Sequence, residues 1–180
     1  MLQAAEPLAI SVDNTSAEPT RVLFVCTGNT CRSPMAAALL NDKMRMREIC
    51  SAMGDSAPCQ EIVATSAGLY PAVGAPISAQ AATALAKAGV VALPGNDYTA
   101  HRARAVSEAL LNEADEVVAI TGAHAMELMM RFPQYAAKIS TLPVDIADPY
   151  GGDVARYTAC LEMLSYAISK RWGEGACDAD

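Results

Sequence analysis

The sequence predicts an α/β fold: a single domain of three layers, doubly wound, with helices on both faces of a four-stranded parallel sheet. Short apolar runs alternate along the chain with longer segments of helical periodicity, which is the pattern of βαβ units. The 180 residues are 52% apolar, enough for one sizeable core, and neither a repeat nor a break in composition divides them.

Four short apolar runs are the expected strands. The first, residues 21–25, is apolar on both faces and is therefore expected at the centre of the sheet. The other three follow at residues 61–66, 115–120 and 138–142. Ligands of such sheets bind beyond the carboxyl ends of the strands, so the residues that follow each run are the candidates for function.

Five segments are the expected helices: residues 33–50, 77–88, 106–114, 122–131 and 154–172. The first opens on Ser33-Pro34, which predicts an N-cap serine followed by a proline in the first turn. The inward residues of that helix are expected to be Met35, Leu39, Met46 and Ile49.

The helix at 122–131 carries three methionines at helical spacing, Met126, Met129 and Met130. They could form a soft binding surface, but methionine at such spacing commonly fills a core. We therefore expect these three side chains to be buried.

The ends of the chain differ from its middle. Residues 1–20 lack the basic start and long apolar centre of a secretory signal and are expected to form a flexible extension. The domain is expected at residues 21–172, followed by an acidic tail at 173–180. No apolar run approaches the ~18 residues of a membrane span. A cytoplasmic protein without a membrane partner is the expectation.

Composition also bears on partners and cofactors. The net charge of −7 argues against a nucleic-acid surface. Only two histidines are present, and no paired-cysteine pattern with a histidine partner favours zinc, so neither a metal nor another cofactor is expected. The chain is too large and apolar to depend on a disulfide framework, so most of its six cysteines are interpreted as reduced thiols: Cys26, Cys31, Cys50, Cys59, Cys160 and Cys177.

The loop after the first strand is the strongest chemical signal. Cys26 ends the apolar run and Arg32 follows six positions later, with Gly28 and Asn29 between them. Gly and Asn tolerate positive φ, so successive backbone N–H groups can form a nest for a phosphate-like anion. The helix that starts at Ser33 adds its positive end. Arginine, nest and helix all favour a thiolate at Cys26.

A second signal follows the fourth strand, where the chain reads Asp148-Pro149-Tyr150-Gly151-Gly152. By itself this pentapeptide is typical of a turn before a helix. It is nevertheless expected at the same sheet edge as Cys26, and displacement at phosphorus needs a proton donor. Asp145, three residues earlier, is the competing carboxylate and is ranked lower.

Cysteine, five residues, arginine and serine near the N-terminus, together with the later Asp-Pro-aromatic sequence, resemble the low-molecular-weight protein phosphatases over about residues 21–172. The resemblance implies the strand order 2-1-3-4 and hydrolysis of a phosphorylated protein or peptide, through a phosphocysteine at Cys26, to inorganic phosphate. It implies Arg32 as phosphoryl ligand and Asp148 as general acid and then base. The phosphate-binding loop would consist of Thr27, Gly28, Asn29, Thr30, Cys31 and Ser33.

The same resemblance bears on neighbouring residues and on the substrate. Ser66 and His101 are expected to join a hydrogen-bond network with the loop, although a lone histidine near two arginines is often structural. Family members similar to protein arginine phosphatases carry threonine where many tyrosine phosphatases carry a bulkier aliphatic residue, and that position is Thr30. A hydroxyl suits a guanidinium and an aliphatic side chain suits an aryl ring. Phosphoarginine is therefore favoured over phosphotyrosine, with Thr30, Leu69 and Tyr150 as the expected substrate pocket.

Cys31 has two interpretations. A second thiol on the same loop could trap an oxidised Cys26 as a disulfide and protect it, or Cys31 could be a small buried residue. An arsenate reductase is disfavoured because it would need a cysteine pair in the middle of the chain, where residues 60–159 have no cysteine. A non-catalytic phosphate-binding module predicts the loss of Cys26, Arg32 or Asp148, and all three are present.

Overall fold

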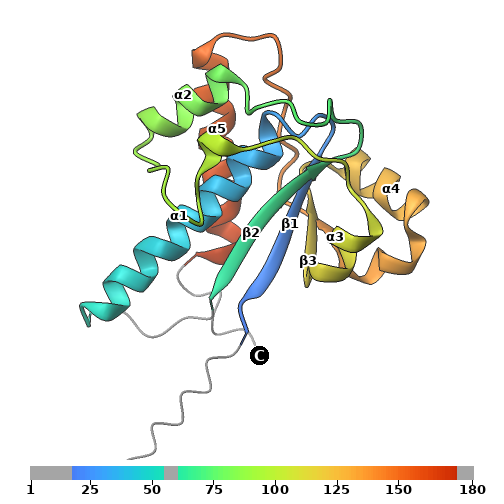
Figure 1. Ribbon diagram of the computed structural model, residues 1–180, viewed down its shortest axis with the longest axis horizontal. Helices are drawn as coiled ribbons and strands as arrows, with labels where there is room; N and C mark the ends of the chain where they lie inside the picture. The colour runs from blue at the N-terminus through green and yellow to red at the C-terminus, as the bar shows by residue number, and fades with distance from the viewer. Residues whose placement is uncertain (1–17, 55–60, 174–180) are drawn as a thin grey trace, which may run out of the picture.

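The computed structural model describes residues 18–54 and 61–173. Within them lies one parallel sheet in the order β2-β1-β3-β4, as predicted (Figure 1). Its strands are β1 (Thr20–Cys26), β2 (Ile62–Gly68), β3 (Glu116–Ala119) and β4 (Ile139–Thr141). The expected α/β fold class and strand order are confirmed.

Helices cover both faces of the sheet, giving the three layers visible in Figure 1. Over the described residues these are α1 (Arg32–Ala52), α2 (Ala79–Lys87) and α5 (Val154–Trp172) on one face, and α3 (Glu108–Glu113) and α4 (Gly122–Arg131) on the other. Short 3-10 helices lie at Tyr98–Ala100 and Pro133–Lys138.

The alternation of side chains along the central strand β1 determines on which face of the sheet Cys26 lies. Val22 and Phe24 pack among α1, α2 and α5, whereas Leu23 and Val25 pack among α3 and α4, and all four are at most 1% exposed. Side chains alternate along a strand, so Cys26 falls on the Phe24 side, where it belongs to the larger core cluster. The nucleophile candidate therefore stands directly before the start of α1.

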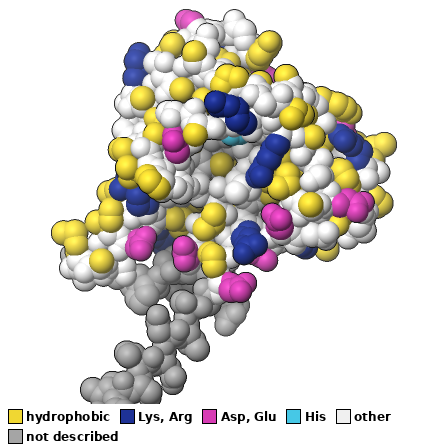
Figure 2. All heavy atoms as spheres, viewed as in Figure 1, with side chains coloured by type: hydrophobic (Ala, Val, Ile, Leu, Met, Phe, Trp, Pro, Cys, Tyr) yellow, Lys and Arg dark blue, Asp and Glu magenta, His cyan; other side chains and the backbone are white. Residues whose placement is uncertain are grey.

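The prediction for the second half of α1 is wrong. Met35 is fully buried, but Met46 and Ile49 are 46% and 41% exposed, and the residues of α1 that are buried all lie at or before Leu40. A helix of 21 residues spans about 30 Å, whereas the seven residues of β1 span about 23 Å. The far end of α1 thus extends past the sheet and carries hydrophobic side chains on its surface (Figures 1 and 2).

The expected burial of the α4 methionines is also wrong. Met126, Met129 and Met130 are 67%, 38% and 78% exposed. The buried positions of this helix are His124, Ala125 and Leu128 instead. The helical period was recognised, but its phase relative to the sheet was not, because periodicity alone does not say which of two partly apolar stripes faces the core.

Some predictions lie outside the described residues. These are the ends at 1–17 and 174–180 and two of the cysteines, Cys59 and Cys177, so the proposed domain limits stay a prediction. In the part of the chain that the structure describes, Cys26, Cys31, Cys50 and Cys160 are free thiols. No helix there is long and apolar enough to cross a membrane.

Candidate active site

The loop from Cys26 to Ser33 is built around one backbone conformation. Asn29 has φ +54°, the only non-glycine residue with positive φ in the described ranges. It is fully buried, and its Nδ2 donates to Ser33 Oγ at 3.0 Å and Ser66 Oγ at 2.9 Å. Its Oδ1 accepts from the Arg104 backbone N–H at 2.9 Å. These three hydrogen bonds hold a conformation that an L-residue otherwise avoids.

Two glycines lie at the loop, and they behave differently from each other. Gly28 does not have positive φ, so Asn29 alone makes the turn. Gly68, which is paired with Cys26 across the sheet, matters for another reason. A Cβ on Gly68 would lie 2.8 Å from the carbonyl oxygen of Thr27, closer than real side chains come. The missing side chain lets the end of β2 support the loop directly.

Cys26 is held against the start of α1. Its Sγ lies 3.0 Å from Ser33 Oγ, and both side chains are buried. The N-cap of α1 is Cys31, so the prediction of Ser33 as N-cap is wrong. Ser33 is instead the second helical residue, and its hydroxyl accepts from Asn29 and can donate to the sulfur. A donor and a helix N-terminus beside the sulfur stabilise a thiolate.

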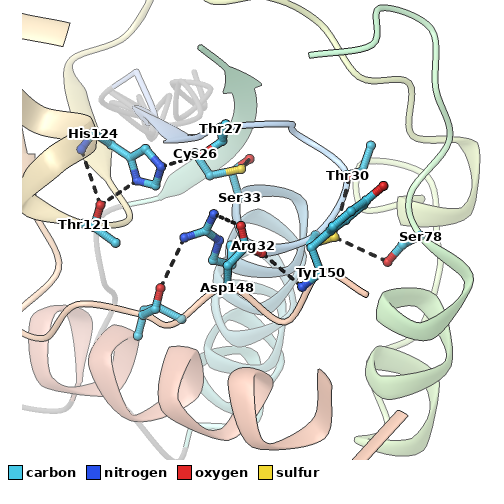
Figure 3. Close-up of polar contacts among 12 residues, drawn as sticks. Cys26, Thr27, Thr30, Arg32, Ser33, Ser78, Thr121, His124, Asp148 and Tyr150 are labelled. Atoms are coloured by element: carbon cyan, nitrogen blue, oxygen red, sulfur yellow. Dashed lines mark hydrogen bonds and ion pairs between the residues drawn. The ribbon is translucent and has the colours of Figure 1, made fainter. Parts of the chain in front are cut away.

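Arg32 and Asp148 meet across the mouth of the loop (Figure 3). Arg32 Nη2 is 2.5 Å from Asp148 Oδ2, and Nη1 donates to the Ile146 carbonyl at 3.3 Å. Arg32 Nε is buried and is one of two buried side-chain nitrogen or oxygen atoms in the described ranges without a hydrogen-bond partner. Asp148 is about half exposed and accepts from the Tyr150 N–H at 3.1 Å. The competing Asp145 instead accepts from the Gly122 N–H at the start of α4, at 2.9 Å.

The loop and the Asp148 segment enclose a cavity of about 230 Å³. Its lining consists of Cys26, Thr27, Gly28, Asn29, Thr30, Cys31, Arg32, Asp148 and Tyr150. Of the three expected pocket residues, Thr30 and Tyr150 belong to this lining, but Leu69 does not. Leu69 is 3% exposed in the core cluster between the sheet and α4. The reason is that β2 ends at Gly68, two residues later than expected, and Leu69 continues its alternation on the same face as Ala67.

His101 lies next to the loop, as expected. Its Nε2 donates to the Asn29 carbonyl at 2.7 Å. Burial lowers the pKa of His101, and the nearby Arg104 and Arg102 lower it further against the opposing effect of that hydrogen bond. A neutral imidazole that donates one hydrogen bond fits this position. The structure therefore brings both Ser66 and His101 onto the buried side of Asn29.

His124, on α4, contacts the loop although its sequence context did not predict this. Its Nε2 lies 2.9 Å from Thr27 Oγ1 and its Nδ1 lies 2.8 Å from Thr121 Oγ1, and the residue is 7% exposed. Thr121 is also the N-cap of α4. The available signal was a Thr-x-x-His sequence directly after the third strand, at the sheet edge where function was expected.

Cys31 has partners of its own. Its Sγ lies 3.2 Å from Tyr157 Oη on α5 and 3.7 Å from Ser78 Oγ, the N-cap of α2. Burial and the bond to Cys31 raise the pKa of Tyr157 to about 12, so this phenol stays neutral. Among the described residues, no group of three or more His, Cys, Asp or Glu side chains is placed to hold a metal ion.

These features define a class of protein. A buried cysteine and an arginine share a loop shaped for a phosphoryl group at the carboxyl edge of a parallel sheet, and an aspartate faces them. This is the architecture of a cysteine-dependent phosphatase.

Residues 21–172 match the family model described as low molecular weight phosphotyrosine protein phosphatase, and the chain belongs to this family of protein phosphatases. It is 36% identical over 159 residues to a protein-arginine-phosphatase of Geobacillus stearothermophilus, covering 84% of this chain and 93% of the relative. It is 30% identical over 151 residues to the probable low molecular weight protein-tyrosine-phosphatase EpsP of Ralstonia nicotianae, covering 82% and 90%. The solved structure of the YwlE arginine phosphatase from Geobacillus stearothermophilus superposes with a TM-score of 0.71, covering 88% of this chain and 93% of that one.

Proposed function

We propose that this protein hydrolyses phosphoarginine in proteins, with Cys26 as the nucleophile. The loop amides, the α1 N-terminus and the Ser33 hydroxyl 3.0 Å from the sulfur all favour the thiolate. Attack on phosphorus in line with the leaving group breaks the P–N bond of the substrate and forms a phosphocysteine. Ser33 then stabilises the thiolate as it leaves in the second step.

Arg32 is proposed to hold the phosphoryl oxygens. Its Nη1 and Nη2 are engaged by Ile146 and Asp148, whereas its Nε is buried without a partner. An unpaired buried donor costs about 1–3 kcal/mol. A phosphoryl oxygen in the loop would satisfy that donor, and the planar fork of arginine suits two oxygens at once.

Asp148 is proposed as the general acid and then the general base. It stands at the mouth of the cavity, where the leaving group would lie, and it is open enough to exchange protons with water. It first protonates the guanidine nitrogen that departs. The resulting carboxylate then takes a proton from the water that attacks the phosphocysteine, which releases inorganic phosphate.

The polar wall of the cavity is the observation that favours phosphoarginine. Thr27 and Thr30 carry hydroxyl groups and belong to the lining. A site built for phosphotyrosine would instead present apolar side chains to the aryl ring. A relative that is 36% identical is named as a protein-arginine-phosphatase. Phosphotyrosine remains the alternative substrate, supported by the exposed aromatic ring of Tyr150 in the same lining and by relatives named as tyrosine phosphatases.

The test is a parallel assay of matched phosphoarginine and phosphotyrosine peptides, followed by release of inorganic phosphate. We expect a higher kcat/KM for phosphoarginine, and no turnover of either peptide by Cys26→Ser. Thr30→Ile should lower the ratio of the two kcat/KM values by about 10-fold. An unchanged ratio in Thr30→Ile would remove the argument from the polar wall, and a wild-type preference for phosphotyrosine would overturn the proposed substrate.

The proposal also includes the compartment. Cys26 must remain a thiol to act, which a reducing cytoplasm ensures. The four free cysteines in the described ranges are compatible with that environment.

A further inference from the structure

A buried histidine stands behind the wall of the cavity and has no part in the mechanism above. His124 lies at the first turn of α4, and its ring bridges two threonine hydroxyls (Figure 3). Nε2 is 2.9 Å from Thr27 Oγ1, and Nδ1 is 2.8 Å from Thr121 Oγ1. Thr27 is exposed and lines the cavity, whereas His124 is buried behind it. The histidine can therefore act on a substrate only through Thr27.

The donors and acceptors of this chain of groups are coupled. A neutral imidazole has one N–H donor and one acceptor nitrogen. If Nδ1–H donates to Thr121, Nε2 accepts a hydrogen bond from the Thr27 hydroxyl. The oxygen of Thr27 then presents lone pairs to the cavity. An imidazolium cannot do this, because both of its nitrogens donate, and the hydroxyl proton of Thr27 must then point elsewhere.

We propose that neutral His124 is a positioning residue for substrate selection: its Nε2 accepts a hydrogen bond from the Thr27 hydroxyl, so that the Thr27 oxygen is free to accept a hydrogen bond from the guanidinium of phosphoarginine. This inference rests on the proposed function. A guanidinium offers only N–H donors, so an acceptor at this wall matches it. The phenyl ring of phosphotyrosine has no donor to offer there. The selectivity between the two substrates thus depends on a residue that contacts neither.

The arrangement predicts a pH signature. Burial and the nearby Arg32 lower the pKa of His124 below its usual 6.5, while Asp148, Glu127 and Asp145 partly oppose this. His124 is therefore neutral at neutral pH and gains a proton only in acid. Protonation would turn Nε2–H toward Thr27 and place a positive charge behind the guanidinium site. Binding of phosphoarginine should then weaken more than binding of phosphotyrosine.

Four variants test this: Thr27→Val, His124→Leu, their double mutant, and His124→Gln. The first two should raise KM for a phosphoarginine peptide about 10-fold, the scale of one lost hydrogen bond to a charged group. They should raise KM for the phosphotyrosine peptide by a clearly smaller factor. The double mutant should equal either single mutant, because both act through one hydroxyl. His124→Gln keeps a neutral partner for Thr27 and should retain the wild-type preference near neutral pH. It should also abolish the fall of the substrate ratio in acid.

Assaying both peptides on each variant separates the outcomes, since any loss of folded enzyme affects both substrates alike. The expected result is a selective, non-additive loss for phosphoarginine and a flat acid profile for His124→Gln. Equal losses for both peptides, or additive ones, would overturn the role of His124 while leaving the phosphoarginine activity standing. A wild type that hydrolyses only phosphotyrosine would remove the proposed function and this inference with it.

Discussion

Two regions beside the proposed catalytic cavity, one behind its lining and one at its mouth, differ in how firmly they are held. One, which we term the buried side, consists of Asn29, Ser33, Ser66, His101 and the backbone of Arg104, and its members are linked by hydrogen bonds of 2.7–3.0 Å. The other, the open side, consists of residues 148–150, where Asp148 is half exposed and Tyr150 is 77% exposed. The comparison teaches that the phosphoryl site is preorganised, whereas the wall for the leaving group is open to solvent and to substrates of varied shape.

The largest expected effect lies on the open side and concerns chemistry alone. Asp148→Asn removes the proposed proton donor and should lower kcat by about 10²–10⁴, the usual contribution of general acid–base catalysis. Its unfolding free energy should change little, because the carboxylate is half exposed. Asp145→Asn is the matched control and should stay close to wild type in steady-state assays. A comparable loss in both variants would contradict the assignment of Asp148.

On the buried side, a single substitution should cost stability as well as rate. Asn29→Ala loses a residue suited to φ +54° and leaves its buried partners unsatisfied. We expect a loss of about 2–4 kcal/mol in unfolding free energy, measured by urea denaturation. Asn29→Gly separates the two causes, since it restores the backbone freedom but not the hydrogen bonds. Tyr150→Ala on the open side should change the unfolding free energy by less than about 0.5 kcal/mol. If Asn29→Ala and Tyr150→Ala lowered the unfolding free energy equally, the contrast between the two sides would be wrong.

Cys31 belongs to neither side: its Sγ lies 3.2 Å from Tyr157 Oη on α5. Its substitution tests whether a second thiol on the loop protects Cys26 from oxidation. We expect wild-type enzyme inactivated by peroxide to recover most of its activity with a thiol reductant. Cys31→Ser should recover little, because oxidation of Cys26 then proceeds past the sulfenic acid. Full recovery of the variant would assign Cys31 to packing alone. Cys160→Ser, at a cysteine whose pKa burial raises to about 12, serves as the control that should behave as wild type.

The smallest expected effect is a pH dependence of stability from His101, which is partly buried, and His124, which is buried. Burial lowers the pKa of both His101 and His124 below 6.5 in the folded protein. The unfolded chain binds protons at these histidines more readily than the folded protein does. The contribution of the two neutral histidines to the free energy of unfolding is therefore complete above pH 6.5. It is lost as the pH falls from there through the lowered values. Thermal unfolding across this range should show a shallower decline for His101→Gln than for wild type. Parallel declines would show that His101 does not titrate in this window.

Local sequence patterns were sufficient to predict much of this architecture. The bounds of α4 and α5 agree with the predicted ranges, and Cys26, Arg32 and Asp148 meet at the expected sheet edge. These successes rest on features carried within short stretches: a helical period, a turn sequence, and the rule that places loops at the ends of parallel strands.

The errors share a physical cause. Each depends on which neighbour the fold supplies: this holds for the face that α4 turns to the sheet, for the burial of Leu69 and for the assignment of Ser33 as N-cap. His124 is the clearest case, because its hydrogen-bond partner Thr27 lies 97 residues away in the chain. No local period encodes such a contact, so an isolated histidine after a strand carries too little information to assign its role.

The close approach at Gly68 sets a limit for anyone who wishes to retarget this enzyme by directed evolution. Any other amino acid at Gly68 would push at least a methyl group against the Thr27 carbonyl. The phosphate-binding loop would then be displaced, whichever substrate the selection favours. Tyr150 carries no such restriction, so libraries that vary it can reshape what is admitted while the reactive centre keeps its form.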